Sequence, residues 1–381
     1  MIPRRIATTF ALAGLALLAH GAAQSAVLPD DRADVLYHRY DGGGVTIDGP
    51  SVLLRKKFAE KYSVSANYYM DMVSSASIDV MTTASPYTEE RTQGSLALDM
   101  LQGKTQYSVS YTLSDESDYT ANTASFDVSQ DIFGDLTTVS FGFSQGWDEV
   151  RKRDDNTFNE TVDRRNYRFS LQQIVTPRLM AGLNYEVITD EGFLNNPYRS
   201  VRYLDDSSAR GYSFQPELYP QTRTSNAVSI TAQYYLPYRA SVSAEYRYFT
   251  DTWGIDANTA SLGYTQPWGK RWILEAGYRW YDQSAADFYS DLFPRADAQN
   301  FLARDKELST FTSHMLSVGA TYELPSIGWD RIRRSTVNLF YDHIIFDYAD
   351  FRDITKGGAP GSEPLYGFSA DVFRLFVSGW F

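Results

Sequence analysis

Charged side chains recur at alternate positions within several segments of this 381-residue chain, and they are its clearest candidates for chemistry. Each is followed at once by an apolar or aromatic residue, as in the segment 239–248. A strand places alternate residues on opposite faces, so these charges share one face. They either form a charged constriction that filters solutes or pair into salt bridges that stiffen a wall. The candidates are Arg168, Glu186, Arg239, Glu245, Arg247, Glu275 and Arg279, with the pairs Glu245/Arg247 and Glu275/Arg279 expected on nearby strands.

Evidence for other chemistry is sparse. A lipase-like Ser-His-acid site needs a histidine beside a serine and an acid, but His343 follows Asp342, and adjacent strand residues point to opposite faces. The acidic stretches 114–118, 151–156 and 203–208 either bind Ca²⁺ weakly or are solvated loop tips. Cysteine is absent, which excludes disulfides, thiolate metal sites and attachment of c-type haem. We therefore expect no enzyme, no cofactor and no metal.

The elements that must position these charges show a period of two residues from residue 45 to the end of the chain. In 223–236, Val228, Ile230 and Tyr234 share one face, and Ser229 and Thr231 lie on the other. The same alternation continues through 238–248, 259–265 and 272–280. The chain is polar on average, with a mean hydropathy of −0.37, and 15% of its residues are aromatic. A sheet with one apolar and one polar face explains how a chain with a polar mean hydropathy can have such a high aromatic content.

The apolar face is typical of a surface that contacts lipid. Its segments are about ten residues long, which is the length a tilted strand needs to cross a bilayer. Tyr234, Tyr238, Trp272 and Trp280 stand at segment ends, as in an aromatic girdle. A β-sandwich would bury a bulkier apolar face. We predict an all-β, transmembrane, antiparallel up-and-down barrel, with a secreted sandwich or solenoid as the alternative.

The lengths of the connections predict the topology. Short connections at 101–104, 131–135, 174–178, 236–239 and 266–270 alternate with longer polar ones at 74–91, 148–161, 190–222, 283–311 and 348–365. Bacterial barrels have short periplasmic turns and long extracellular loops, so both termini are expected in the periplasm. Fourteen strands fit between residues 62 and 381. A hairpin at 34–57 would make sixteen, with Gly49-Pro50 as a bulge or an edge feature.

The last ten residues, "VFRLFVSGWF", alternate up to a terminal aromatic. Phe373, Leu375, Val377, Gly379 and Phe381 form the lipid face of a closing strand that should pair with the first strand. This ending resembles the C-terminal signal that the outer-membrane assembly machinery recognises.

The first 25 residues read as a signal peptide, with Arg4 and Arg5 before an apolar stretch, and they predict Sec export to the cell outer membrane. Residues 26–381 then form one barrel domain, in which 27–44 is either a segment inside the lumen or the first strand. The mature net charge is 33 − 47 = −14, because the signal carries two of the 35 basic residues and none of the 47 acids. Such a charge argues against nucleic-acid partners.

Two of the long connections, 191–204 and 286–311, are rich in Phe, Tyr and Leu. Fully exposed loops are seldom so apolar. We expect these loops either to fold inward as a plug or to form a surface that binds a partner or ligand.

Several stretches resemble a Gram-negative family known as domain of unknown function 3570. They include "VLYHRYDGGGVTIDGPSVLLRKKF", "ITDEGFLNNPYRSVRY" and "YLPYRASVSAEYRYFTDTWGI", and the resemblance spans nearly all of the mature chain. It implies an outer-membrane barrel without an assigned active site, often encoded near a flavin transferase and small periplasmic or lipoprotein partners.

We expect a pore or passive transport channel of unknown substrate. The alternative is a non-conducting scaffold that holds a periplasmic or surface partner and serves envelope redox or metal physiology. The expected partners are outer-membrane lipid and lipopolysaccharide, the barrel assembly machinery, and a periplasmic protein or lipoprotein.

Overall fold

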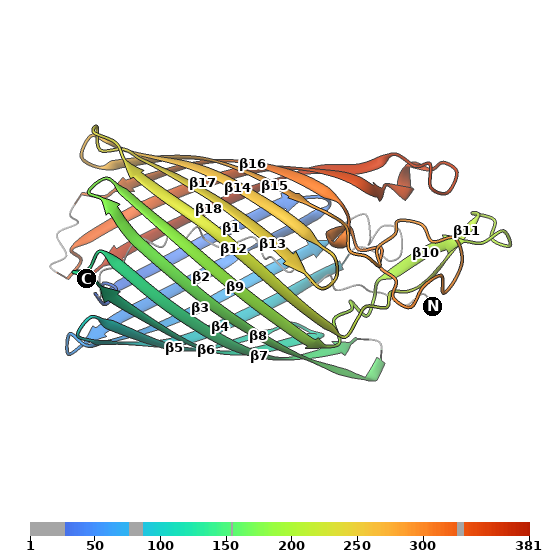
Figure 1. The fold of residues 1–381 in the computed structure, drawn as a ribbon, viewed down its shortest axis with the longest axis horizontal. Coiled ribbons are helices and arrows are strands. Elements are labelled where there is room, and N and C mark those ends of the chain that lie inside the picture. Colours follow the sequence, from blue (N-terminus) through green and yellow to red (C-terminus); the bar gives the residue numbers. More distant parts are fainter. Residues whose placement is uncertain (1–26, 76–86, 154, 326–330) are drawn as a thin grey trace.

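The computed structural model describes residues 27–75, 87–153, 155–325 and 331–381 and forms a closed antiparallel barrel (Figure 1). The predicted signal peptide lies outside the described residues. The first half of the wall comprises β1 (Arg32–Gly42), β2 (Val45–Phe58), β3 (Tyr62–Ser75), β4 (Tyr87–Gln102), β5 (Thr105–Asp115), β6 (Tyr119–Ile132), β7 (Thr137–Lys152), β8 (Asp155–Thr176) and β9 (Leu179–Gly192). The second half comprises β12 (Thr222–Tyr235), β13 (Ser241–Asp251), β14 (Asp256–Trp268), β15 (Trp272–Gln283), β16 (Phe311–Glu323), β17 (Arg334–Arg352) and β18 (Leu365–Trp380).

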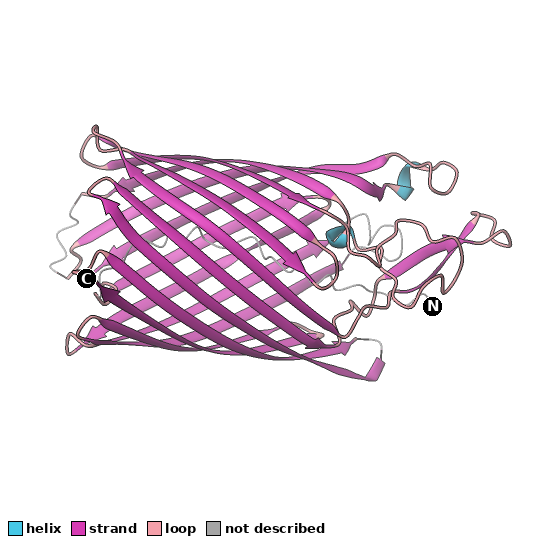
Figure 2. Ribbon diagram, viewed as in Figure 1, coloured by secondary structure: helices cyan, strands magenta, loops and turns pink. Residues whose placement is uncertain are grey.

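Little structure lies outside the wall. A small hairpin of β10 (Ser200–Leu204) and β11 (Tyr212–Pro216) extends beyond one end of the barrel, as Figure 2 shows. Two short 3-10 helices, Lys306–Leu308 and Ile354–Lys356, lie in connections at that end. No helix in the described ranges is long and apolar enough to cross a membrane.

The barrel has sixteen strands rather than fourteen, because the hairpin of β1 and β2 is part of the wall. β1 pairs with β2 on one side and with β18 on the other. Leu375 lies opposite Tyr37 and Val377 opposite Val35, so the last strand closes on the first as predicted. Of residues 27–44, the segment Arg32–Gly42 is therefore the first strand.

The expected bulge or edge at Gly49-Pro50 is wrong. β2 has neighbours on both sides, and its register with β3 is the same before and after the pair, with Asp48 opposite Met72 and Ser51 opposite Tyr69. Gly49 instead permits a close approach, because an added Cβ would lie 1.9 Å from the carbonyl oxygen of Met70.

The two ends of the barrel differ as the sequence predicts. One end carries turns such as 103–104, 177–178 and 269–271 together with the C-terminus, and we call it the short-turn end. The other, the long-loop end, carries the long connections 193–221 and 284–310.

The predicted loop at 148–161 is wrong, because β7 continues to Lys152 and β8 begins at Asp155. Paired strands keep their backbone hydrogen bonds beyond the membrane, so a polar sequence can remain in the ladder.

The outward face is apolar and carries a repeated aromatic contact near the long-loop end. Val35, Leu96, Ile230, Leu262 and Leu316 are among its exposed side chains. Six tyrosines on this face each hydrogen-bond the residue on the next strand that lies two positions closer to the long-loop end. The pairs are Tyr111–Asn122, Tyr185–Asn226, Tyr246–Asn258, Tyr248–Asp256, Tyr278–His314 and Tyr341–Asp371, at 2.6–2.8 Å. Such amphipathic rings are typical of a membrane–water boundary.

The close approach at Gly49 gives a testable prediction. Gly49→Ala should destabilise the folded barrel by about 1–3 kcal/mol, because its methyl group must displace the backbone of β3. Gly94→Ala is the matched control, because a Cβ at Gly94 would meet nothing within 4 Å. Urea titration followed by tryptophan fluorescence in detergent measures both. Equal midpoints for the two variants would contradict the steric account.

Candidate functional site

Six of the seven predicted charges lie in wall strands, on the face opposite the lipid-facing residues. Arg168 is in β8, Glu186 in β9, Glu245 and Arg247 in β13, and Glu275 and Arg279 in β15. The seventh prediction is wrong in its position: Arg239 lies in the turn between β12 and β13 with φ 70, because β13 begins only at Ser241.

A first ion pair forms across a glycine. Asp127, Gly142 and Arg168 occupy opposed positions on β6, β7 and β8. Because Gly142 has no side chain, Arg168 reaches over β7 and donates to the Asp127 carboxylate at 2.9 Å. A Cβ at residue 142 would lie 2.3 Å from that carboxylate, so a side chain there would displace it from its present position. Asp127 was not among the predicted residues, although its alternation with Phe126 and Val128 is visible in the sequence.

A second ion pair lies beside the first. Arg247 reaches over β12, where the inward residues are Ala227 and Ser229, and pairs with Glu186 at 3.1 Å. Asn166 also donates to Glu186, at 2.9 Å. We call Asp127, Arg168, Glu186, Glu245 and Arg247 the charged band.

The charged band lines a cavity of about 350 Å³, together with Ser170, Asn184 and Ser229. Its paired side chains are far from sealed: Arg168 and Asp127 keep 40% and 45% of their surface accessible, and Arg247 and Glu186 keep 35% and 30%. Glu245 also lines the cavity, and within the described ranges its carboxylate has no hydrogen-bond or ion-pair partner. The band therefore faces a space that water can occupy.

Glu275 and Arg279 do not join this band. β14 separates their strand from β13, so the two predicted pairs are not on hydrogen-bonded neighbours. The Arg279 Nε is buried and has no hydrogen-bond partner among the described residues. The structure thus brings four predicted charges together in the charged band: Arg168, Glu186, Glu245 and Arg247. Glu275 and Arg279 of β15 lie outside it.

The inward face of β1 and β3 is different, because it holds a buried pair, His38 and Asp71. His38 Nε2 lies 2.7 Å from Asp71 Oδ1, and Arg91 pairs with the other oxygen of the same carboxylate. The Tyr69 ring stacks on His38 at 4.9 Å. His38 and Asp71 are only 3% and 1% exposed. Sequence analysis missed this cluster, since its members come from three strands with no shared motif.

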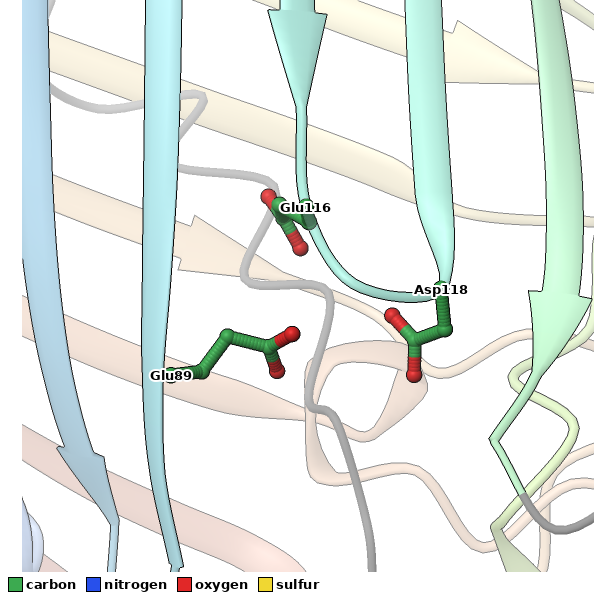
Figure 3. Close-up of side chains that lie close together, drawn as sticks. All are labelled: Glu89, Glu116 and Asp118. Atoms are coloured by element: carbon green, nitrogen blue, oxygen red, sulfur yellow. The ribbon is translucent and has the colours of Figure 1, made fainter.

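One carboxylate cluster at the long-loop end is the arrangement best able to hold a metal ion among the described residues. Glu89, Glu116 and Asp118 each place an oxygen within 4.8 Å of the others, and Figure 3 shows the three groups converging. Burial, followed by the charge of Glu89, raises the pKa of Glu116 to about 7 and raises the pKa of Asp118. Arg153 and Ser117 already hydrogen-bond Glu89, and Tyr198 donates to Asp118 at 2.8 Å. Protein groups therefore already occupy two of the three carboxylates, those of Glu89 and Asp118.

The long connections pack against one another into a structure that we call the cap, formed by 193–221, 284–310 and 353–364. Its apolar interior includes Tyr219 and Phe288, which pack against Trp253 of the β13–β14 turn, and the three rings meet at 5.1–5.5 Å. Phe293 and Leu302 are buried with Val201 in a second cluster. Packing of loop against loop therefore accounts for the apolar residues in the stretches 191–204 and 286–311.

Segment 198–202 joins the three connections of the cap to one another and to the neighbouring turns at the long-loop end. Tyr198 accepts from the backbone N–H of Arg153 at 3.1 Å and donates to Asp118, so it contacts the connections beside β5–β8. Arg202 is fully buried. Its Nη1 donates to Glu363 at 2.5 Å in the β17–β18 connection, and it also pairs with Asp291 in the β15–β16 connection. These connections lie far apart in the strand order, so the segment bridges separate sides of the barrel end.

Removing the Arg202 cation should loosen the cap. Arg202→Ala leaves the Asp291 and Glu363 carboxylates buried without it, a change that costs about 3–5 kcal/mol for a buried pair. Hydrogen exchange should then accelerate at the amides of Leu204, Phe293 and Leu302, which bond between loops. Arg210→Ala, at an exposed turn position, is the control. Unchanged exchange in Arg202→Ala would show that this network does not hold the cap.

Comparison with solved structures finds other barrels at low identity. A structure described as "Bacterial polysaccharide outer membrane secretin" is 7% identical, with a TM-score of 0.49, over 93% of this chain and 100% of that chain. A Pseudomonas aeruginosa FadL homologue is 10% identical, with a TM-score of 0.45, over 93% and 91%. In-vitro folded OmpT of Vibrio cholerae is 9% identical, with a TM-score of 0.43, over 93% and 99%.

No curated protein sequence matches the chain. A family model does match, over residues 7–328, which is most of the sequence. The resemblance noted from the sequence is therefore confirmed, and the chain, a closed sixteen-strand barrel of the outer-membrane type, belongs to the family described as "Protein of unknown function (DUF3570)".

Proposed function

We propose that this protein is an outer-membrane pore that passes small hydrophilic solutes and prefers cations. The observation that carries the proposal is the accessibility of the charged band in the middle of the wall. Side chains sealed inside a packed lumen would be dry, whereas these keep a third to nearly half of their surface open. A polar, solvated inner wall is what an aqueous channel needs.

The preference for cations follows from the charge of the band. Three carboxylates and two guanidinium groups give 2 − 3 = −1, and the extra carboxylate is that of Glu245. A negative group on the wall of a low-dielectric passage raises the local cation concentration.

A scaffold without conductance is the second candidate function. It is supported by the cap, which bridges separate sides of the long-loop end, and by the buried inward residues of β1 and β3. A partner bound in fixed stoichiometry, recovered from intact membranes, would favour this candidate.

We assign no catalytic role. Asp342 pairs with Arg374 at 2.6 Å on the inner face, and His343 pairs with Asp371 at 2.8 Å on the outer face. The barrel wall therefore separates the histidine from the neighbouring acid, which supports a boundary role for His343.

Conductance in a planar bilayer tests the proposal. The purified barrel should give stepwise currents, and under a salt gradient the reversal potential should show cation selectivity. Glu245→Gln should lower the cation-to-anion permeability ratio by roughly twofold or more, because it removes the unpaired wall charge. Glu60→Gln, in the β2–β3 turn, is the control. No current from folded protein would overturn the pore, and equal effects of both variants would overturn the role of Glu245.

A further inference from the structure

Glu217 is a buried carboxylic acid at the centre of the cap, between β11 and β12. It is 6% exposed. One carboxylate oxygen accepts from the backbone N–H of Arg304 at 2.7 Å, and the other accepts from the Tyr219 hydroxyl at 2.6 Å. Its own N–H donates to the Arg199 carbonyl at 3.2 Å, so it joins the base of the bridging segment 198–202 to connection 284–310.

The charged groups around Glu217 come from both connections. Arg199 faces it from the bridging segment, and Asp305 faces it from the other connection. Arg199 attracts an ionised Glu217 and lowers its pKa, but Arg199 also forms an ion pair with Asp305. The Arg304 guanidinium pairs with Asp291 at 2.9 Å. An ionised Glu217 is therefore a third carboxylate beside these two cations in a dry site.

We propose that the cap is a lid whose closure is governed by a proton on Glu217, so that the long-loop end is held shut in acid and released near neutral pH. The protonated acid suits the closed cap, because it keeps its acceptor for the Arg304 N–H and can donate its proton to the Tyr219 oxygen. The ionised acid suits an open cap, where water solvates the charge.

The direction of the pH dependence follows from the pKa of Glu217. Burial, with Asp305 next, raises that pKa from 4.5 to about 7 in the closed cap. An opened, solvated Glu217 returns to its ordinary pKa. The extra stability of the closed cap is therefore fully present below pH 4.5, declines as the pH rises, and is lost once the pH passes about 7. Over that interval the ratio of open to closed caps should rise roughly a hundredfold.

A distance measurement tests this lid directly. The chain has no cysteine, so Ala209→Cys in the β10–β11 turn and Asn159→Cys in β8 give a unique pair of exposed sites for nitroxide labels. Pulsed electron–electron double resonance in detergent should show one narrow distribution of label-to-label distances at pH 5. At pH 8 a second population with longer distances should appear. In Glu217→Gln, which imitates the protonated acid, the narrow distance should persist at both values. Glu191→Gln, an exposed acid in β9, should behave like the parent protein.

A second variant tests the same proposal if Glu217→Gln does not fold. Tyr219→Phe retains the acid and removes a hydroxyl that lowers its pKa, so the midpoint of opening should move to higher pH. Identical distances at pH 5 and 8 in the parent protein would overturn the proposal, as would an unshifted midpoint in Tyr219→Phe. The readout does not depend on current, so the lid and the pore can fail separately.

Discussion

Every other feature of this protein depends on the pairing of each wall strand with two neighbours. In hydrocarbon, a backbone N–H or C=O without a partner costs several kcal/mol, so a sheet in lipid must close. Here β1 meets this requirement by pairing with β2 and β18 at once. Closure also fixes the register around the barrel, and the register decides which side chains face lipid and which face inward. The inward charged band and the six outward tyrosine contacts near the long-loop end are both consequences of that register.

Small residues let the inner wall support contacts across a strand. At Gly142 and Ala227, the missing bulk leaves room for an arginine to reach over one strand to a carboxylate on the next. The pairs stay accessible because the inward positions beside them are small or polar, as at Ser170, Asn184 and Ser229. The large side chains that alternate with them, such as Phe169 and Tyr185, lie on the outward face. A wall of this kind is both stiffened by ion pairs and wet, so the two interpretations of the charged residues are compatible. Exposed pairs add little stability, and their main effect is on the field within the lumen.

Much of the barrel could be predicted from the sequence because period-two alternation is a local signal. It predicted the outward positions and the closing strand Val372–Phe381. The lengths of the connections, which are also local, predicted which end of the barrel carries the short turns. Two kinds of information were not local. Gly49-Pro50 suggested a bulge from residue type alone, whereas the register of β2 on β3 is the same on either side of the pair, and that register depends on a strand that the pattern does not align with it. The cap required knowledge of which loops meet. Arg202 and its partner Glu363 are 161 residues apart, and no spacing rule connects them.

The structure therefore combines a closed wall, an accessible charged interior and a packed cap at one end. Its central claim is that alternate residues of each strand face lipid and water. Single cysteines introduced along β13 in proteoliposomes test this claim most directly, with a membrane-impermeant thiol reagent as the probe. At pH 8, positions 243, 245 and 247 should react, and positions 242, 244 and 246 should be protected. Uniform reactivity along the strand, or protection of the first set alone, would contradict the account.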